Sequence, residues 1–395
     1  MVQLAKHEVC TACGACAFRC PQHCISMRED SSGNIFPDID YVHCVECHAC
    51  EKVCPILNPI HSKKPDAAYA AWSSDDEERQ TSASGGIAAE MYKYALANGY
   101  YAVGAAQNSD FSVTHKIART LEETFPFKNS KYVFSQAYDA FAGIKKILQH
   151  DGNKVIFIGL PCQVAALRKL FHDDENLLSV DLVCHGTTPV AYLRQHVDLI
   201  ERQLGRFAKR MSFRTPPETY KFIFTLYDEK NIGFYSKRTK DGDSYQFGYH
   251  KAVTYRENCY HCSFARPERT GDITIADYHG LGSCAPCRYN ARNVSLVLIN
   301  SEKGESFINE LIENRHIYAE LRPIEEPFKG EPQLRHPSKK NKYRLLFEEE
   351  IDKYNGDFEK AIKKPLKIWK REELVKLLLK QPYTIARKIK KKIIG

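Results

Sequence analysis

The sequence contains no continuous apolar run long enough to span a lipid bilayer, so no membrane-spanning helix is expected. Its first residues, MVQLAKHEVC, lack the apolar core of a secretory signal, and we therefore expect a protein that is not exported. No nucleic-acid-binding motif accompanies the net charge of +8, so a nucleic-acid partner is not expected. The chain has 395 residues, of which 43% are hydrophobic, enough for two or three domains with a sizeable core.

The positive charge is concentrated in the C-terminal tail rather than spread over the chain. From Lys363 onward, twelve Lys or Arg residues against two Glu give +10, which leaves −2 for everything before. If Thr384–Gly395 is helical, Ile385, Ile389 and Ile393 share one edge and lysines lie opposite. This pattern is typical of a basic helix on an anionic lipid surface. A solvated terminal helix or a disordered tail fits equally well, and both alternatives stay open.

Cysteine, in contrast, is abundant: there are fifteen, and nine of them precede residue 55. In a chain of this length the number indicates metal binding in a reducing cytoplasm rather than a secreted disulfide scaffold. Eight of the nine fall into two runs in which the thiols are separated by two, two and three residues and proline follows directly. The runs are Cys10, Cys13, Cys16, Cys20 with Pro21, and Cys44, Cys47, Cys50, Cys54 with Pro55.

This spacing is that of bacterial two-cluster ferredoxins, in which each 4Fe–4S cluster takes three ligands from one run and the fourth from the other. We therefore expect one cluster on Cys10, Cys13, Cys16 and Cys54, and another on Cys44, Cys47, Cys50 and Cys20. Disulfides or two zinc knuckles are the alternative, but neither has a reason to repeat this spacing. Cys24 belongs to neither set and is interpreted as a small buried residue.

The predicted fold class is α+β. We expect a small dicluster ferredoxin domain at residues 1–60, a polar linker, a mixed α/β region divided into 66–150 and 151–330, and a helical basic tail at 331–395. Gly33–Asn34 predicts a hairpin turn in the first domain. Apolar runs predict buried strands at Ala67–Trp72, Tyr101–Ala105, Lys154–Gly159, Leu178–Val183 and Ser295–Asn300.

Other segments give weaker signals. Ser73–Gln80 is interpreted as a polar turn, and Met211–Phe247 alternates aromatic with polar residues, which predicts antiparallel strands. Ser306–Asn314 is predicted to be helical. In the tail, charged helices are expected over Phe347–Lys364 and Glu372–Lys380.

Candidate binding residues follow two of the predicted strands. Cys162 and Cys184 come directly after buried strands, at the edge where open α/β sheets bind ligands. A buried structural cysteine is the common alternative. The turn Thr81–Gly86 leads into a helix, and backbone N–H groups at such a point can hold phosphate, although a plain capping turn is equally consistent.

Two further pairs of cysteines lie downstream. Cys259-x-x-Cys262 and Cys284-x-x-Cys287 have the spacing of a zinc ribbon.

Residues 66–330 resemble the coenzyme F(420) hydrogenase/dehydrogenase beta-subunit family, which also includes flavin–iron–sulfur reductases of chlorophyll-type substrates. The motifs that carry the resemblance are SASGG at Ser82–Gly86, SKYVFS at Ser130–Ser135, KVIFIGLPCQVAALRKL at Lys154–Leu170, DLVCHG at Asp181–Gly186, and NCYHCSFA with R-x-x-DITIADY within Asn258–Tyr278. Asp277-Tyr278-His279 departs from the family pattern, as do Cys284 and Cys287.

The resemblance implies that the mixed α/β region binds a flavin, FAD being expected. The matching positions are Ser84, Gly85, Gly86, Lys131, Tyr132, Gly159, Pro161 and Gln163. It also implies a third 4Fe–4S cluster on Cys162, Cys184, Cys259 and Cys262, and the zinc ribbon remains its competitor.

Four polar residues are candidates for roles at the same site. His185 and His279 could donate protons, because imidazole titrates near neutrality, or could be hydrogen-bonded structural residues. Arg256 and Arg269 could pair with a phosphate of the substrate or flavin, or could form ordinary ion pairs.

These observations lead to one functional expectation with two alternatives. We expect a cytoplasmic iron–sulfur flavoprotein oxidoreductase, and peripheral membrane contact through its tail is one of the alternatives left open above. It would take single electrons from a ferredoxin-like or other low-potential donor and reduce an organic acceptor through the flavin. The first alternative is an electron-transfer subunit between a hydrogenase or dehydrogenase and a deazaflavin coenzyme. The second is a redox sensor or scaffold without flavin.

Overall fold

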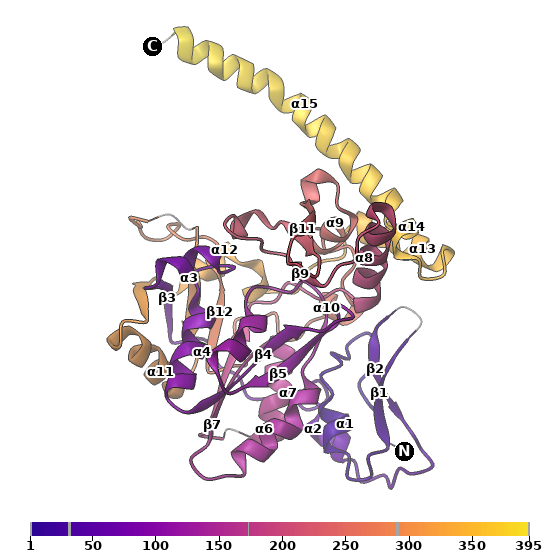
Figure 1. The fold of residues 1–395 in the computed structure, drawn as a ribbon, viewed down its shortest axis with the longest axis vertical. Helices are drawn as coiled ribbons and strands as arrows, with labels where there is room; N and C mark the ends of the chain where they lie inside the picture. Colours follow the sequence, from indigo (N-terminus) through magenta and orange to yellow (C-terminus); the bar gives the residue numbers. More distant parts are fainter. Residues whose placement is uncertain (1, 31–32, 173, 290–291, 394–395) are drawn as a thin grey trace.

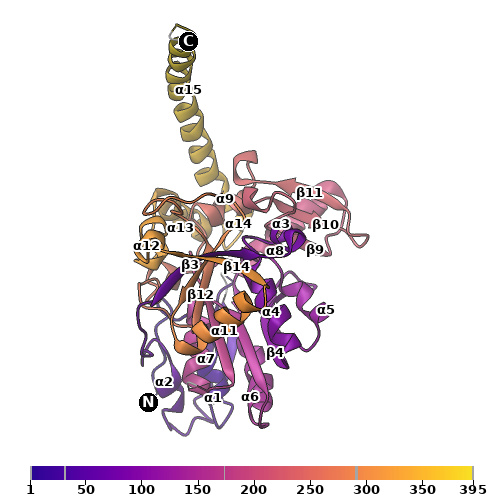
Figure 2. The same ribbon diagram turned by 90° about the vertical axis from the view of Figure 1, so that its left-hand side faces the viewer.

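The computed structural model describes residues 2–30, 33–172, 174–289 and 292–393 (Figure 1). For residues 380–393 only the backbone is described. The chain forms an N-terminal hairpin module, a central sheet covered by helices, a mixed cap and a projecting C-terminal helix (Figures 1 and 2). Within the described ranges, no helix is both long and apolar enough to cross a membrane.

The N-terminal module, residues 2–57, consists of two short helices and one hairpin. Its elements are α1 (Ala15–Arg19), β1 (Ile25–Glu29), β2 (Ile35–Ile39) and α2 (Ala49–Val53). Strands β1 and β2 pair antiparallel. The amide of Gly33, which has a φ of +79°, donates to the carbonyl of Asp30, and the amide of Asp30 donates to the carbonyl of Asn34. The predicted hairpin is thus confirmed.

A nine-stranded mixed sheet forms the centre of the molecule. In spatial order its strands are β14 (Ile317–Arg322), β3 (Ala67–Ser73), β13 (Ser295–Ile299), β12 (Ile273–Asp277), β8 (Leu177–Leu182), β7 (Lys154–Gly159), β4 (Tyr100–Gln107), β5 (Val113–Ala118) and β6 (Ser135–Gln136). Strands β12, β8, β7 and β4 are mutually parallel, so their carboxyl ends share one edge. All five predicted strands are present, and the mixed α/β fold is confirmed. Strands from before and after residue 150 belong to this one sheet, and the proposed domain boundaries stay predictions.

Both faces of the sheet are covered because its central strands are apolar on both sides. In β7, Ile156 and Ile158 face α4 (Ile87–Ala97) and α11 (Glu302–Glu313), whereas Val155 and Phe157 face α6 (Phe141–Leu148) and α7 (Pro161–Phe171). Side chains alternate between the faces of a strand, so a continuous apolar run marks a strand buried on both sides. Helix α11 begins four residues before the predicted Ser306.

The N-terminal module packs directly onto the second of these faces. Ala15 of α1 and Val53 of α2 belong to the same buried cluster as Val164 and Leu167 of α7. Both views of the ribbon place α1 and α2 beside α7 (Figures 1 and 2). The module is therefore part of one core with the sheet.

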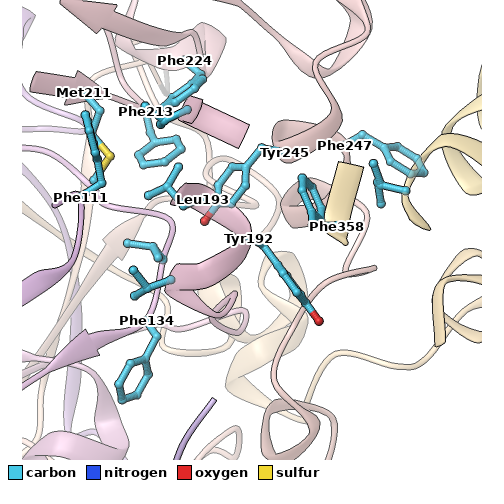
Figure 3. Close-up of a cluster of buried hydrophobic side chains, with 14 of the residues drawn as sticks. Phe111, Phe134, Tyr192, Leu193, Met211, Phe213, Phe224, Tyr245, Phe247 and Phe358 are labelled. Atoms are coloured by element: carbon cyan, nitrogen blue, oxygen red, sulfur yellow. The ribbon is translucent and has the colours of Figure 1, made fainter. Parts of the chain in front are cut away.

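A separate aromatic core holds the cap together (Figure 3). The cap contains α8 (Val190–Leu204), β9 (Arg210–Ser212), β10 (Phe224–Tyr227), β11 (Gly233–Lys237) and α9 (Ser244–His250). The three strands form an antiparallel sheet, as predicted. The strand prediction was wrong for Ser244–Phe247, which are helical because the Asp243 carboxylate caps α9 by accepting from the Gln246 amide. The polar turn expected at Ser73–Gln80 likewise contains a helix, α3 (Asp76–Thr81), capped by Asp75.

The C-terminal tail starts within the core and then leaves it. Its helices are α13 (Lys342–Lys353), α14 (Phe358–Ala361) and α15 (Lys363–Ile393). The continuous helix predicted over Phe347–Lys364 was wrong, because Asn355 and Gly356 adopt positive φ and break it. Phe358 and Trp369 are buried in the cap core. Beyond them α15 projects away from the body (Figure 1), and the predicted apolar edge of Ile385, Ile389 and Ile393 lies outside the described side chains.

Candidate functional site

The first predicted set of thiols surrounds one small cavity in the N-terminal module. The cysteines on its wall are Cys10, Cys13, Cys16 and Cys54. Ala12 and Gly14 adopt left-handed backbone conformations, which curl the chain around the cavity. Burial raises the pKa of Cys13 to about 12, although the amide of Ala15 donates to its sulfur and lowers it. Amides of Ala12 and Ala17 donate to Cys10 and Cys16 in the same way.

The second predicted set surrounds a neighbouring cavity, together with one additional thiol. Its wall contains Cys20, Cys44, Cys47 and Cys50, and also Cys24. The sulfur of Cys24 lies 3.4 Å from that of Cys20, and this hydrogen bond raises the pKa of Cys24 to about 12. Cys24 is buried, as interpreted, but it is also in contact with a candidate ligand.

The third set comes together at the carboxyl edge of the parallel strands. Cys162 follows β7, Cys184 follows β8, and Cys259 lies in α10 (Glu257–Tyr260) with Cys262 just after it; all four line one cavity. Burial raises the pKa of Cys162 well above its usual range, and the charges of Cys262 and Cys184 raise it further. Burial also raises the pKa of Cys262 to about 11. Amides of Gly186, Phe264 and Ala265 donate to these sulfurs, as does the amide of Thr187, 3.4 Å from Cys259.

The competing zinc arrangement does not form among the described residues. Cys284 is exposed, and its sulfur lies 3.2 Å from Nζ of Lys329, while the thiol of Cys287 donates to the carbonyl of Tyr289. Neither lines the cavity of Cys259 and Cys262. Over the described ranges, no three His, Cys, Asp or Glu side chains are close enough to hold a single metal ion.

The donor chemistry of the three cavities fits iron–sulfur clusters. Each cavity offers at least four thiols. Backbone N–H groups donate to several of the sulfurs, and such contacts tune iron–sulfur clusters. The third cavity also has two buried cations on its wall, Arg256 and Arg269. A cluster held by four thiolates is anionic, so the guanidinium group of Arg256 would balance part of its charge, whereas Arg269 is paired with Asp181.

The two arginines do not line the large cavity, and the alternative of an ordinary ion pair applies to Arg269. Arg269 forms a buried ion pair with Asp181, with 2.8 Å between Nη2 and Oδ1. Arg256 donates to the carbonyls of Thr11 and Ile35 in the N-terminal module, and its buried Nε has no partner. Arg256 thus joins the module to the body.

A cavity of about 600 Å³ lies beside the third thiol group, at the carboxyl edge of β7, β8 and β12. Six of the eight predicted flavin-contact residues line it: Ser84, Gly86, Lys131, Tyr132, Gly159 and Gln163. Two do not. The amide of Gly85 donates to Oγ of Ser295, and a side chain there would meet Ala71 and Ser295. Pro161 lines the third thiol cavity and starts α7.

One end of this cavity is suited to an anionic group. Helix α4 begins at Ile87, and its N-cap residue, Gly86, has no side chain to cap it, so among the described residues its first N–H groups are without a capping side chain. Burial lowers the pKa of Lys131 to about 7, and its Nζ donates to the carbonyls of Lys128 and Asn129. Oδ1 of Asn129 is buried and has no hydrogen-bond partner within the described part of the chain.

An aromatic wall forms another side. Tyr132 and Tyr249 stack with ring centroids 4.3 Å apart, and Tyr255 contacts Tyr249 edge-on at 5.4 Å. Buried Arg214 donates to Tyr132, forms an ion pair with Asp277 and lies 3.9 Å above the ring of Phe222. Sequence reasoning missed Arg214, Phe222, Tyr249 and Tyr255, because no motif surrounds them and only the fold of the cap brings them to the cavity.

Both candidate proton donors line the cavity and share one buried carboxylate. Nε2 of His185 and of His279 lie 3.5 Å and 3.7 Å from Oε2 of Glu331, whose side chain is 2% exposed. Burial opposes ionisation of Glu331, but the hydrogen bond and charge of His185 outweigh it and lower the pKa. Sequence reasoning missed Glu331, which lies just after α12 (Glu325–Gly330) at the start of the predicted tail.

The cavities form a connected series. Cys16 packs with Cys20 and Cys50 between the first two thiol groups. Cys13 lies on the walls of both the first and the third thiol cavities, and Cys184 on the walls of both the third and the large cavity. The shared residues place the thiol groups next to one another from the N-terminal module to the large cavity.

Comparison with known proteins gives matches for both the N-terminal module and the body. Residues 152–326 match a family model described as the C terminus of the coenzyme F(420) hydrogenase/dehydrogenase beta subunit, and residues 9–57 match the 4Fe–4S dicluster domain. The chain is 20% identical over 336 residues to the F subunit of the F(420)H(2) dehydrogenase of Methanosarcina mazei, an alignment that covers 82% of this chain and 88% of the relative. A chain of the xenon-derivatised F(420)-reducing NiFe hydrogenase complex from Methanosarcina barkeri is similar at 18% identity and a TM-score of 0.44, covering 78% of this chain and 92% of that one.

The resemblance recognised in the sequence is therefore confirmed, and the protein is an iron–sulfur oxidoreductase with a role in electron transfer. Residues 152–326 carry the C-terminal domain of the coenzyme F(420) hydrogenase/dehydrogenase beta subunit, and residues 9–57 carry a 4Fe–4S dicluster domain.

Proposed function

We propose that this protein is an electron-transfer subunit that exchanges electrons between a redox partner protein and a flavin-type coenzyme in the large cavity. The observation that carries the proposal is the connected series of thiol-lined cavities, with Cys13 and Cys184 each on two walls. Clusters held by these thiols would carry single electrons, and a flavin or deazaflavin ring would exchange two.

Each thiol group has a proposed ligand role. Cys10, Cys13, Cys16 and Cys54 would hold the first cluster, Cys20, Cys44, Cys47 and Cys50 the second, and Cys162, Cys184, Cys259 and Cys262 the third. Amide donors and the buried Arg256 and Arg269 support the assignments, because both stabilise negative charge on the sulfurs.

The large cavity offers complementary chemistry for a coenzyme with a planar ring and an anionic chain. The stacked Tyr132 and Tyr249 can contact such a ring, and Lys131 with the start of α4 can hold phosphate. The relatives are named after F(420), which favours a deazaflavin as the exchanging coenzyme. FAD, expected from the motifs, would use the same contacts.

We assign proton handling to the histidine pair at the cavity wall. Two-electron reduction of an organic ring or carbonyl also requires protons. Both imidazoles line the cavity, with Nε2 3.5 and 3.7 Å from the Glu331 carboxylate, so either is placed to pass a proton to a bound ring. The same pair supports the second candidate function, a reductase in which bound FAD reduces an organic acceptor directly.

The partner is expected to dock at the second thiol group. Cys47 is exposed, and the surrounding apolar side chains Tyr41, Val42 and Val45 are 54%, 88% and 60% exposed. An exposed apolar patch next to a redox centre is a suitable contact for an electron-transfer protein. The partner would be a hydrogenase or dehydrogenase subunit or a ferredoxin-like low-potential donor, in the cytoplasm.

Metal and coenzyme content test the proposal first. Protein purified without oxygen should contain about twelve irons per chain, at four per cluster, and no stoichiometric zinc. Cys162→Ser should lower iron to about eight per chain, whereas the matched Cys284→Ser, which removes a thiol outside the cavities, should leave it unchanged. Iron of about eight in the unmodified protein would remove the third cluster from the proposal.

Reaction with coenzyme separates the two candidate functions. If the electron-transfer proposal is right, reduced deazaflavin should bleach the cluster absorbance of the purified chain, and Tyr249→Ala should slow the reaction. If the chain retains FAD and only an organic acceptor reoxidises it, the reductase function is correct. A chain that binds neither flavin nor deazaflavin contradicts both.

A further inference from the structure

The C-x-x-C pair at Cys284 and Cys287 has no part in the proposed electron route. It lies in the long connection between β12 and β13, on the surface, with Cys284 exposed and Cys287 half-buried. Neither thiol lines any of the three thiol cavities or the large cavity. Among the fifteen cysteines this pair is therefore left without a role.

A buried ion pair fixes the conformation of the turn that carries the two thiols. Arg322 and Glu326 are 3% and 0% exposed, with 2.9 Å between Nη2 and Oε1. The carboxylate accepts from the amides of Cys284 and Ala285 at 3.1 and 3.4 Å. The guanidinium donates to the carbonyls of Ala285 and Pro286 at 2.5 and 3.1 Å.

Glu326 remains ionised in this ion pair. Burial opposes ionisation of Glu326, but the hydrogen bonds from Arg322 and from the turn amides outweigh it and lower the pKa to about 2. Hydrogen bonds to ionised groups are the stronger class in proteins. The backbone of Ala285 and Pro286, the two residues between the cysteines, is thus fixed by hydrogen bonds to the buried ion pair. Cys284 itself is exposed to solvent.

A cation lies next to the exposed sulfur. Nζ of Lys329, in α12, is 3.2 Å from Sγ of Cys284. An ammonium group at this distance interacts favourably with a sulfur that carries negative charge, both when that sulfur attacks and when it leaves. Cys287 instead donates its S–H to the carbonyl of Tyr289 at 3.4 Å, so the two thiols differ in exposure and in partner.

We propose that Cys284 and Cys287 form a surface dithiol that exchanges with low-molecular-mass disulfides, with Cys284 as the attacking thiol and Cys287 as the resolving thiol. The grounds are a turn fixed by a buried ion pair, an exposed sulfur beside an ammonium group, and a second thiol three residues away.

The exchange balances without another reactant. The sulfur of Cys284 bonds to one sulfur of the disulfide, whose S–S bond breaks and releases one thiolate. The sulfur of Cys287 then bonds to that of Cys284, and the second thiolate leaves. Two electrons pass from the cysteine pair to the disulfide, and the two cysteine protons end on the released thiolates. The reverse sequence reduces the Cys284–Cys287 disulfide.

Oxidised glutathione is a suitable probe for the intact, cluster-containing protein without oxygen. After incubation, free thiols are blocked with N-ethylmaleimide and peptides containing residues 284–287 are analysed by mass spectrometry. The unmodified protein should form the Cys284–Cys287 disulfide. Cys287→Ser should stop at a glutathione adduct on Cys284, and Cys284→Ser should form no adduct at Cys287 on the same timescale.

The role of the ammonium group is tested by a matched pair of variants. Lys329→Met should slow adduct formation in the Cys287→Ser background by roughly two- to fivefold, the effect of an exposed ion pair, and Lys329→Arg should preserve the rate. Unchanged cluster absorbance shows that each variant is folded.

Three results would overturn the proposal: a reduced pair in the unmodified protein, absence of the adduct on Cys284, or one zinc per chain that is lost on substitution of either cysteine. The first two results do not bear on the electron-transfer function, because these thiols lie outside the proposed cluster ligands. Zinc that is lost on substitution of Cys284 or Cys287, with about twelve irons retained, would contradict only the dithiol proposal and the expected absence of zinc.

Discussion

At the scale of single residues, the contact between the N-terminal module and the body depends on positions that do not accommodate a different side chain. Gly14 has a φ of +75°, and a Cβ at this position would lie 2.4 Å from Cβ of Tyr138. Arg256 crosses the same boundary and is almost fully buried. These residues fix where the first thiol cavity lies relative to the third.

Gly14→Ala should destabilise the protein by at least about 1–2 kcal/mol, the cost of a left-handed conformation, and further through the contact with Tyr138. Gly99→Ala is the matched control, because Gly99 has a φ of +78° but a Cβ at this position would meet no atom within 4 Å. Thermal unfolding without oxygen compares the two. Equal losses in both variants would show that the Tyr138 contact has no effect.

Arg256→Met should destabilise the contact between module and body and make the neighbouring clusters harder to reduce. It leaves the carbonyls of Thr11 and Ile35 without their donor, at about 1–3 kcal/mol each, and removes a positive charge that favours added electrons. Arg256→Lys keeps the charge and should retain the reduction potential better. Redox titration followed by electron paramagnetic resonance measures this difference, and equal potentials in the two variants would contradict the electrostatic role.

Residues with a strong local pattern could be predicted from the sequence, and those defined only by tertiary contacts could not. Repeated cysteine spacing predicted the two N-terminal thiol groups that the structure brings together, because ligands of one cluster are mostly close in sequence. Arg214 and Glu331 lie far from any motif and reach the large cavity only when the cap folds over the sheet. Gly85 matched a family motif, but it packs against the sheet instead of facing the cavity.

At the scale of secondary-structure elements, one buried polar network joins α8, α9 and α14. His196 of α8 lies 3.0 Å from Asp243, which caps α9, and 2.6 Å from Glu359 of α14. Burial disfavours its charged form, but the two carboxylates outweigh burial and raise the pKa of His196 to about 9. The start of the tail is thereby tied to the cap by a charged histidine.

This network predicts a pH dependence of stability. Since the pKa of His196 is higher in the folded state than its usual value of 6.5, its contribution is complete below about pH 6.5 and is lost as the pH rises through about 9. The contribution is roughly 3 kcal/mol, at 1.36 kcal/mol per pKa unit. The free energy of unfolding of the unmodified protein should fall between about pH 6.5 and about 9. In His196→Gln this fall should be absent. Parallel pH profiles of the two proteins would argue against the network.

Strands with continuous apolar runs could be predicted from the sequence, whereas helices that start at a capping carboxylate could not. The run Lys154–Gly159 is a strand with the predicted bounds, since only a strand buried on both faces has such a composition. Asp75 and Asp243 start helices that were expected to be a turn and a strand, because a single capping carboxylate is a weak signal in sequence.

At the scale of the whole molecule, exposed apolar surfaces lie near both ends of the chain. One is the patch around Cys47 in the N-terminal module, and the other lies on α15 beyond the cap. The projecting part of α15 exposes Leu374, Val375, Leu377, Leu378 and Leu379 by 53–69%. We expect the patch around Cys47 to contact a protein partner and the surface of α15 to contact a lipid membrane.

Val42→Asp combined with Val45→Asp should leave stability unchanged and weaken electron exchange with a protein partner. Because both side chains are exposed next to Cys47, charge there should lower kcat/KM for the protein donor by roughly tenfold, as expected for residues at the centre of an interface. A small chemical reductant should work as before. Leu204→Asp, on an exposed position of α8, is the control, and an equal effect there would rule out a specific patch.

Deletion of residues 374–395, which keeps Glu372 and its contacts with Lys342 and Tyr343, should abolish binding to anionic vesicles without lowering the unfolding temperature. The deleted segment contains the exposed leucines and six of the ten lysines from Lys363 onward, while Trp369 and the cap core remain. Flotation with anionic and with uncharged vesicles measures the contact. Binding that persists after the deletion would place the lipid contact elsewhere.

The packing of Ala15 and Val53 into the core of α7 also concerns how electrons move inside the molecule. Many redox proteins carry their small electron-carrying domain on a tether, and its search for the acceptor then limits turnover. Here the module is already docked. The rate of electron transfer within the molecule should therefore not change with solvent viscosity or when the connection at residues 58–65 is lengthened.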